Sequence, residues 1–170
     1  MDTDIEKATP DDFAEILELY HIATSVHKKL GIIQWDDEYP SGETLKENLE
    51  SEVTWVIKVG DKIIATVTLD EDQDPQYKDI QWAYPSSNVL VVHRVCIDPS
   101  FQGRGLAKRL MLFSETFARE NNYEVIRFDA FLGNNASQRL YRNMGYHEAI
   151  GYCYYHPDMI MCNCFEKRVY

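Results

Sequence analysis

A short segment with two glycines, between an apolar strand and a helix, has the residues needed to bind an anion. Residues 98–106 read Asp-Pro-Ser-Phe-Gln-Gly-Arg-Gly-Leu. Glycines let a backbone approach a ligand closely and turn several N–H groups the same way. The first turn of the helix adds unpaired N–H donors and a positive dipole end, and Arg104, Lys108 and Arg109 add charge. The pattern predicts a phosphate site, with a tight structural turn as the alternative.

This segment matches neither of the two most familiar phosphate motifs. The P-loop pattern GxxxxGK[ST] is absent from the chain. Gly103 and Gly105 supply only the first half of the dinucleotide pattern GxGxxG, and Lys108 stands where the third glycine would be. A nucleotide-hydrolysing or Rossmann-type site is therefore not expected.

Two linked motifs resemble the GNAT superfamily of acyl-CoA N-acyltransferases. Residues 102–107, Gln-Gly-Arg-Gly-Leu-Ala, fit the family signature Q/R-x-x-G-x-G/A, with Ala107 in place of the commoner glycine. Residues 134–146 contain an asparagine, an alanine, a Leu-Tyr pair and a Gly-Tyr pair, as in a second family block. The motifs occur in the expected order, and the resemblance spans Val89 to Tyr146.

The resemblance implies acetyl-CoA as cosubstrate and direct transfer of its acetyl group to a primary amine in a ternary complex. It implies that the backbone of Val95 and Ile97 binds the pantetheine arm as an added strand, that the glycine segment holds the pyrophosphate, and that Asn134 contacts the cosubstrate further along. The implied binding residues are Val95, Ile97, Gln102, Gly103, Arg104, Gly105, Leu106, Ala107, Lys108 and Asn134.

The resemblance also places Tyr141 near the thioester sulfur, where a phenol could protonate the leaving thiolate. A tyrosine in the apolar stripe of a short helix is otherwise a core residue. His93 is the titratable group on the strand 89–97, and alternation predicts that it shares a face with Val95. The sequence leaves three proton acceptors open: His93, Asp129 on the next strand, or a water chain.

The uneven distribution of charged residues along the chain bears on the charge of the acceptor. Residues 1–81 hold 20 acidic and 7 basic residues, whereas residues 82–170 hold 8 and 10. An acidic first half favours a cationic acceptor, a small-molecule amine or a protein amine, unless the charge is simply solvated surface. Aromatic residues stand in the segments that form the acceptor side in this family, and packing is their simplest role: Trp35, Tyr39, Tyr77, Trp82 and Tyr84.

Several classes of function are disfavoured. A net charge of −11 argues against nucleic acid and anionic membranes. With neither a long apolar run nor an apolar leader, a cytoplasmic enzyme is expected. Four cysteines are expected to be reduced core residues, and no metal site is expected. A catalytically inactive CoA-binding sensor or regulatory module is the alternative function, and a homodimer is left open.

The chain is predicted to form a single domain, residues 1–170, that positions the candidate site residues. Its predicted class is α+β, the GNAT fold, with a mixed, mostly antiparallel central sheet flanked by helices on both faces, in the order β-α-α-β-β-β-α-β-α-β-β. Residues 89–97 are predicted to be buried on both faces, and residues 70–76 to form a loop. Leu106, Leu110, Phe113 and Phe117 are predicted to face inward. Strands are expected at 5–8, 55–59, 63–69, 89–97, 125–130, 146–154 and 161–167, and helices at 9–30, 41–50, 105–120 and 135–143.

Overall fold

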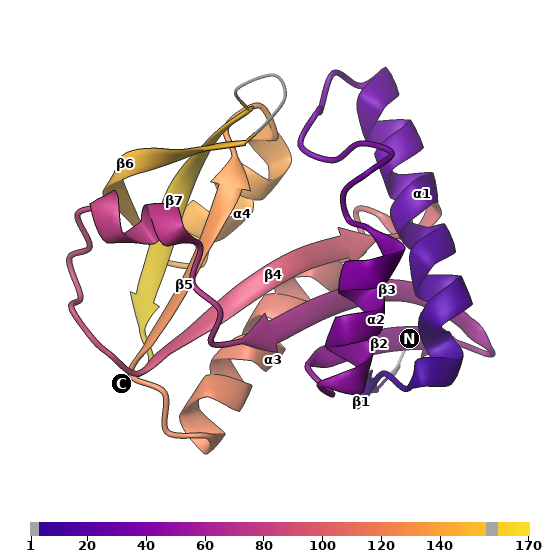
Figure 1. The fold of residues 1–170 in the computed structure, drawn as a ribbon, viewed down its shortest axis with the longest axis horizontal. Coiled ribbons are helices and arrows are strands. Elements are labelled where there is room, and N and C mark those ends of the chain that lie inside the picture. The colour runs from indigo at the N-terminus through magenta and orange to yellow at the C-terminus, as the bar shows by residue number, and fades with distance from the viewer. Residues whose placement is uncertain (1–3, 156–159) are drawn as a thin grey trace. The chain divides into compact units, whose positions relative to one another are not determined.

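The computed structural model describes residues 4–155 and 160–170 (Figure 1). It contains a mixed, mostly antiparallel sheet of seven strands in the order β1-β2-β3-β4-β5-β7-β6, together with four α-helices, which confirms the predicted fold class. The strands are β1 (Ile5–Lys7), β2 (Thr54–Val59), β3 (Lys62–Asp70), β4 (Val89–Ile97), β5 (Val125–Phe131), β6 (His147–Tyr155) and β7 (Ile160–Arg168). The helices are α1 (Phe13–Lys29), α2 (Gly42–Glu50), α3 (Leu106–Glu120) and α4 (Asn135–Asn143), and the short 3-10 turns are η1 (Pro10–Asp12), η2 (Pro75–Asp79) and η3 (Pro99–Phe101).

The chain divides into two compact units. The first comprises Met1–Leu69 and His93–Ser114, and the second comprises Asp70–Val92 and Glu115–Tyr170. Strand β4 and helix α3 are each divided between the two units, β4 after Val92 and α3 after Ser114. The glycine segment lies in the first unit, and Tyr141 lies in the second.

Two faces of the first unit are covered by helices. Val56 of β2 packs in one apolar cluster with Ile16 of α1 and Leu45 of α2. On the opposite side of β2, Trp55 lies 5.8 Å from Phe113 of α3, measured between ring centroids. Because neighbouring strand residues point to opposite faces, β2 buries side chains against both layers. The predicted hairpin between β2 and β3 is confirmed, since Val59 pairs with Lys62 across a two-residue turn.

The second unit also has two packed faces. One face joins β4, β5, β6 and β7 to η2 through apolar residues that include Tyr77, Val91 and Cys153. The other face carries an aromatic cluster in which Phe128 of β5 lies 4.6 Å from Tyr141 of α4, between ring centroids. Strand β5 therefore separates two layers of different chemistry.

A buried ion pair holds the segment between β3 and β4 in the second unit. Glu166 of β7 is 0% exposed and accepts hydrogen bonds from the backbone N–H groups of Ala83 and Tyr84 at 2.5 and 3.2 Å. Arg127 lies 4.0 Å from the same carboxylate, and its guanidinium covers the Trp82 ring at 4.3 Å. These contacts give a segment without strands a fixed position against β5 and β7.

The predicted loop at 70–76 includes the beginning of a helical turn. Asp74 caps η2 by accepting a hydrogen bond from the Gln76 N–H at 2.9 Å. The Gln76 side-chain amide then bonds both backbone groups of Tyr154, accepting from its N–H at 2.8 Å and donating to its carbonyl at 3.2 Å. Because β6 is the last strand in the sheet order, this amide satisfies backbone groups that an edge strand would otherwise leave open.

Two burial predictions need correction. In α3, the fully buried residues include Leu110, Met111 and Ser114, whereas Phe113 and Phe117 are only partly buried. Strand β4 is continuously buried only over its first four residues, and in its second half only Cys96 is buried, since β4 pairs with β5 in parallel only from Val89 to Val91. The second half of β4 is thus more open than a continuous apolar run suggests.

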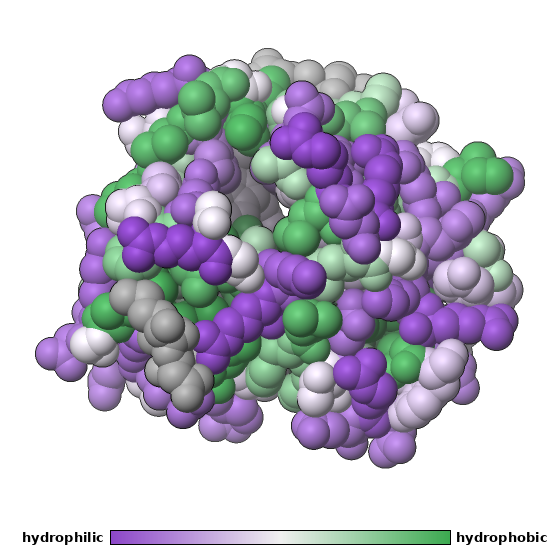
Figure 2. Space-filling view, turned by 180° about the vertical axis from the view of Figure 1, so that it is seen from behind, coloured by the Kyte–Doolittle hydropathy of each residue, from purple (hydrophilic) through white to green (hydrophobic). Residues whose placement is uncertain are grey.

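The cysteines and the surface agree with a packed globular chain. All four cysteines are free and buried, which confirms that they are reduced core residues. On the face drawn in Figure 2, hydrophilic side chains are interspersed with smaller apolar patches. Among the helices of residues 4–155 and 160–170, none has the length and apolar character needed to cross a bilayer.

The Glu166 contacts predict a large loss of stability on truncation. Replacing Glu166 by alanine leaves Arg127 buried without its carboxylate and removes two backbone hydrogen bonds, so the free energy of unfolding should fall by about 3–5 kcal/mol. Urea unfolding measures this loss. The matched control is Glu50→Ala, which removes an exposed ion pair with Lys46 and should cost less than about 1 kcal/mol. Equal losses in both variants would contradict the structural role of Glu166.

Candidate functional site

Asp98 fixes the point where β4 ends and the glycine segment begins. Its side chain is almost fully buried, and one carboxylate oxygen accepts hydrogen bonds from the Ser100 N–H at 2.9 Å and the Ser100 hydroxyl at 2.6 Å. The other oxygen accepts from Lys62 Nζ of β3 at 2.6 Å. Burial by itself would raise the pKa of Asp98, but the bonds from Lys62 and Ser100 lower it below its usual value. Asp98 is therefore an ionised anchor for η3.

Gly103 and Gly105 both adopt the left-handed backbone conformation, with φ of +75° and +77°. Residues with a side chain rarely adopt these angles. No atom beyond the adjacent residues lies within 4 Å of a Cβ built on either glycine, so backbone conformation rather than crowding requires glycine here. Left-handed residues in such a turn direct successive N–H groups into a concave site that suits an anion. This geometry agrees with the predicted phosphate site.

Basic groups gather around this turn. The Arg104 guanidinium lies 4.8 Å from the centroid of the Phe101 ring, and Lys62 Nζ lies 5.6 Å from the same ring. Lys108 is exposed in the first turn of α3. The sequence analysis missed Lys62, because Lys62 is 36 residues before Asp98 and only the pairing of β3 with the end of β4 brings the two together. The turn, the start of α3 and these cations thus lie together within the first unit, and the anion site stays a prediction.

Val95 and Ile97 lie in the second half of β4, on the strand where the sequence predicted them, and both are half-buried rather than fully buried. Arg94, immediately before Val95, has φ of +51°. This conformation interrupts the regular pleat, so simple alternation cannot place His93 and Val95 on the same face. That expectation for His93 was therefore unsupported, although His93 does lie in β4, half-buried, in the same unit as the glycine turn.

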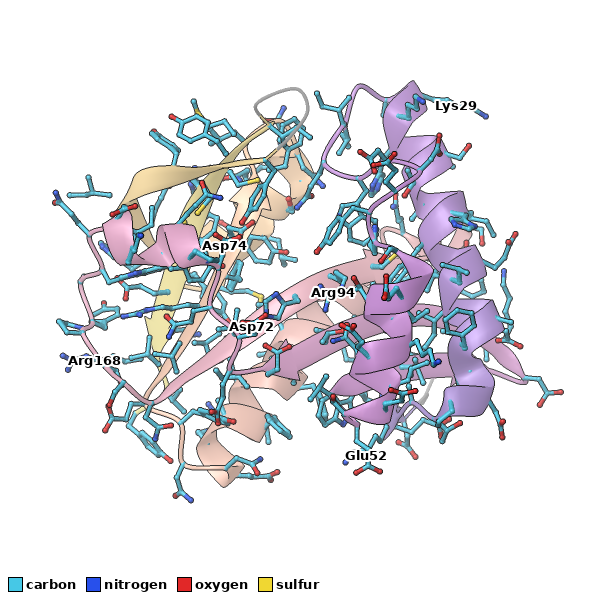
Figure 3. All side chains as sticks on the ribbon, viewed as in Figure 1. Lys29, Glu52, Asp72, Asp74, Arg94 and Arg168 are labelled. Atoms are coloured by element: carbon cyan, nitrogen blue, oxygen red, sulfur yellow. The ribbon has the colours of Figure 1, made fainter. Side chains whose placement is uncertain are left out.

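Arg94 also connects β4 to the segment that follows α1 (Figure 3). Its guanidinium donates to Asn48 Oδ1 of α2 at 2.6 Å and to the Tyr39 hydroxyl at 3.2 Å. Nearby, the rings of Tyr20 and Trp35 meet edge to face at 5.5 Å. Of the aromatic residues considered for the acceptor side, Tyr39 and Trp35 thus belong to the first unit and pack near this arginine.

Tyr141 is buried in the aromatic cluster of the second unit and is 7% exposed. Its ring lies 4.6 Å from Phe128 and 5.4 Å from Phe165, between centroids. Burial, followed by the negative charge of Asp129, raises the pKa of Tyr141 to about 12. The phenol therefore keeps its hydrogen at neutral pH, as a proton donor must. The same packing is also what a core tyrosine would show, so the catalytic role of Tyr141 stays a proposal.

Asp129 and Asn134 have defined local roles in the second unit. The Asp129 carboxylate accepts hydrogen bonds from the hydroxyls of Tyr77 at 2.8 Å and Tyr155 at 3.0 Å. Asn134 caps α4 by accepting from the Ser137 N–H at 3.2 Å. The cap explains an asparagine at this position without a ligand, and a cosubstrate contact by Asn134 stays a prediction.

The remaining aromatic residues of the expected acceptor side make packing and hydrogen-bond contacts in the second unit. The Trp82 indole N–H donates to the Tyr77 carbonyl at 2.9 Å, and its ring meets the Tyr77 ring at 5.3 Å. The Tyr84 carbonyl accepts from Arg127 at 3.0 Å. These contacts favour the packing interpretation for Trp82 and Tyr84.

The structure thus brings the predicted site residues together in two groups. Residues 102–108, Val95, Ile97 and His93 lie in the first unit, and Asn134, Tyr141 and Asp129 lie in the second. Within the described part of the chain, no three His, Cys, Asp or Glu side chains are arranged to hold a metal ion.

Comparison with known proteins adds independent findings. A model of the acetyltransferase (GNAT) family matches residues 13–146. A GNAT-family acetyltransferase from Streptococcus agalactiae has a TM-score of 0.80 at 21% identity, covering 98% of this chain and 95% of that one. YncA from Salmonella typhimurium, solved with its cofactor acetyl-CoA, has a TM-score of 0.72 at 16% identity, covering 99% and 95%. The PaiA N-acetyltransferase from Thermoplasma acidophilum, in complex with coenzyme A, has a TM-score of 0.69 at 15% identity, covering 99% of both chains. No curated protein sequence matches.

The Asp98 anchor predicts a pH-dependent contribution to stability. Because its pKa is lowered in the folded state, Asp98 stabilises the fold above its unfolded pKa of about 3.9, and this contribution disappears as pH falls through the lower folded value. Asp98→Asn should lower the free energy of unfolding by about 1–3 kcal/mol at pH 7. The difference from wild type should shrink below pH 4 in urea titrations. Exposed Asp61→Asn serves as the control, and a gap independent of pH would argue against an ionised Asp98.

Proposed function

Because the chain belongs to the GNAT acetyltransferase family, we propose that it transfers the acetyl group of acetyl-CoA to a primary amine. The observation that carries this proposal is the left-handed turn at Gly103 and Gly105, which contains Arg104 and is followed directly by α3 with Lys108 in its first turn. It supplies N–H donors and positive charge suited to a pyrophosphate. The structures of YncA with acetyl-CoA and of PaiA with coenzyme A support the choice of cosubstrate.

In this proposal, the amides of Gly103 to Lys108 hold the pyrophosphate, together with Gln102 and Arg104. The backbone of Val95 and Ile97 receives the pantetheine arm as an added strand. Asn134 contacts the cosubstrate while its side chain also caps α4. Binding both substrates side by side removes the entropic cost of a bimolecular encounter from the chemical step.

Tyr141 is the proposed general acid. A direct attack of the amine on the acetyl carbon expels the CoA thiolate, and Tyr141 donates its proton to that sulfur. Its raised pKa ensures that the proton is present before attack. His93 and Asp129 are the two side chains proposed for removing the proton from the amine nitrogen. The acceptor is a small-molecule amine or a protein amine, and the acidic residues 1–81 favour a cationic one.

Release of free CoA over a panel of amines tests the proposed activity. Turnover with at least one amine supports a transferase, and a favoured cationic acceptor should lose kcat/KM as salt rises. Tight acetyl-CoA binding without CoA release for any amine would instead support a binding or sensor module.

The turn predicts a specific loss of cosubstrate binding. Acetyl-CoA at about 100 times its Kd should stabilise the wild type by about 2.7 kcal/mol. Gly105→Asp places a carboxylate at the turn and should abolish the acetyl-CoA-dependent rise in Tm. The control is Gly60→Asp, which strains a left-handed position of φ +59° in the β2–β3 hairpin with the same open surroundings. If Gly105→Asp binds acetyl-CoA like the control, the turn is not the pyrophosphate site.

Tyr141→Phe tests the general acid. A single acid typically contributes about 10²–10⁴ in rate, so kcat should fall within that range while acetyl-CoA affinity changes only a few-fold. Steady-state kinetics and calorimetry measure the two quantities. Tyr146→Phe is the matched control, since Tyr146 lies in the same aromatic cluster, 6.3 Å from Tyr141 between ring centroids. An unchanged kcat in Tyr141→Phe would show that Tyr141 has a packing role and is not the general acid.

A further inference from the structure

Four polar side chains of the second unit form a continuous chain of short contacts. Asp129 Oδ2 lies 2.8 Å from the Tyr77 hydroxyl and 3.0 Å from the Tyr155 hydroxyl. The same Tyr155 hydroxyl lies 3.1 Å from Oδ2 of Asp74. Asp74 is half-buried at the start of η2, where Figure 3 labels it. The phenol of Tyr155 therefore bridges a carboxylate on β5 and a carboxylate on η2.

The cluster has fewer hydroxyl hydrogens than it has hydrogen-bond contacts. A phenol has one hydrogen, so Tyr155 can donate to Asp129 or to Asp74 but not to both. Tyr77 already uses its own hydrogen on Asp129. One further proton, carried by either carboxylate, completes the second contact of Tyr155. The three contacts therefore need one proton more than the two phenols supply.

Asp129 and Tyr141 lie on opposite faces of β5. Phe128, which contacts Tyr141, and Asp129 are consecutive strand residues, so their side chains point to opposite sides. The charge of Asp129 nevertheless raises the pKa of Tyr141, so the two groups are within electrostatic reach. The other titratable groups that face Asp129, directly or through Tyr155, come from η2, β6 and β7: Tyr77, Tyr155, Cys162, Cys164 and Asp74.

Resting on the transfer reaction proposed above, we propose that Asp129 takes the proton from the attacking amine nitrogen and that Tyr155 and Asp74 pass it to solvent. Asp129 is then a catalytic residue, and Tyr155 and Asp74 form its relay. The acid and the base would act from the two faces of β5, one on the leaving sulfur and one on the entering nitrogen.

The protons and bonds balance over one turnover. The neutral amine nitrogen bonds to the acetyl carbon and becomes acidic, and it loses one proton to the Asp129 carboxylate. The C–S bond breaks, and the sulfur gains one proton from Tyr141. Asp129 then gives its proton to the Tyr155 oxygen while Tyr155 gives its own hydrogen to Asp74, which releases it to water. Tyr141 recovers a proton from water, so the enzyme returns to its starting state without any further reagent.

The relay predicts different behaviour in the first turnover and in later ones. Asp129→Asn removes the proton acceptor and should slow the first turnover by about 10²-fold or more. Tyr155→Phe and Asp74→Asn leave Asp129 in place, so rapid mixing should show a first release of CoA at the wild-type rate. Later turnovers should be at least about tenfold slower, because Asp129 stays protonated. The phenylalanine keeps the ring, and the asparagine keeps the acceptor oxygen that caps η2.

Small buffers separate a relay from a structural effect. In Tyr155→Phe, imidazole at high concentration should restore steady-state kcat to within about threefold of wild type by carrying the proton instead. The matched control is Tyr123→Phe, which removes another phenol–carboxylate hydrogen bond of the same unit, to Glu71 at 2.8 Å. It should change neither the rate of the first turnover nor the rate of later ones. Equal melting temperatures show that each variant is folded.

Several results would overturn the relay. Steady-state rates of Tyr155→Phe within twofold of wild type would do so, and so would an equally slowed first turnover or a loss that imidazole does not restore. A slow first turnover in His93→Gln together with a normal one in Asp129→Asn would assign the proton acceptor to His93. If the wild type releases no CoA with any amine, the proposed function fails and the relay fails with it. If the wild type turns over and the variants match it, only the relay fails.

Discussion

The ionised carboxylate of Asp98 is the contact on which the geometry of the glycine turn depends. It lies at the end of β4, is almost fully buried, and bonds at once to Lys62 of the neighbouring strand and to Ser100 of the following turn. A buried charge is tolerated only when its hydrogen bonds are made, so the strand end and the turn are held in one arrangement. Gly103 and Gly105 then follow in left-handed conformations, and α3 begins directly behind them.

In the second unit, a different buried pair of charges fixes the segment between β3 and β4. Glu166 and Arg127 are buried together, and their remaining hydrogen bonds go to Gln73, Ala83 and Tyr84 of the segment between β3 and β4. A segment with little regular structure is thereby fixed against β5 and β7. The same segment carries Asp74 of the proposed relay and Tyr77, which donates to Asp129, so its order is a condition for that relay.

Strand β5 illustrates how alternation can separate chemical roles. Its Phe128 side packs against Tyr141 and Phe165 in an aromatic layer, and its Asp129 side meets hydroxyl groups of Tyr77 and Tyr155. One layer buries the phenol of Tyr141, and the other holds the carboxylate of the proposed relay.

Local patterns in the sequence determined most of the secondary structure and the glycine turn. The bounds of β4 and α4 agree with the pattern, because an apolar run ending at Asp-Pro and a capped amphipathic stretch are encoded within a few neighbouring residues. The glycine turn was predictable for the same reason. The contact of Lys62 with Asp98, the left-handed conformation of Arg94 and the bridge from Asp129 through Tyr155 to Asp74 were decided only by the tertiary structure. Each joins residues from separate strands and turns or breaks a regular period, so it depends on strand pairing and on the neighbours that packing supplies.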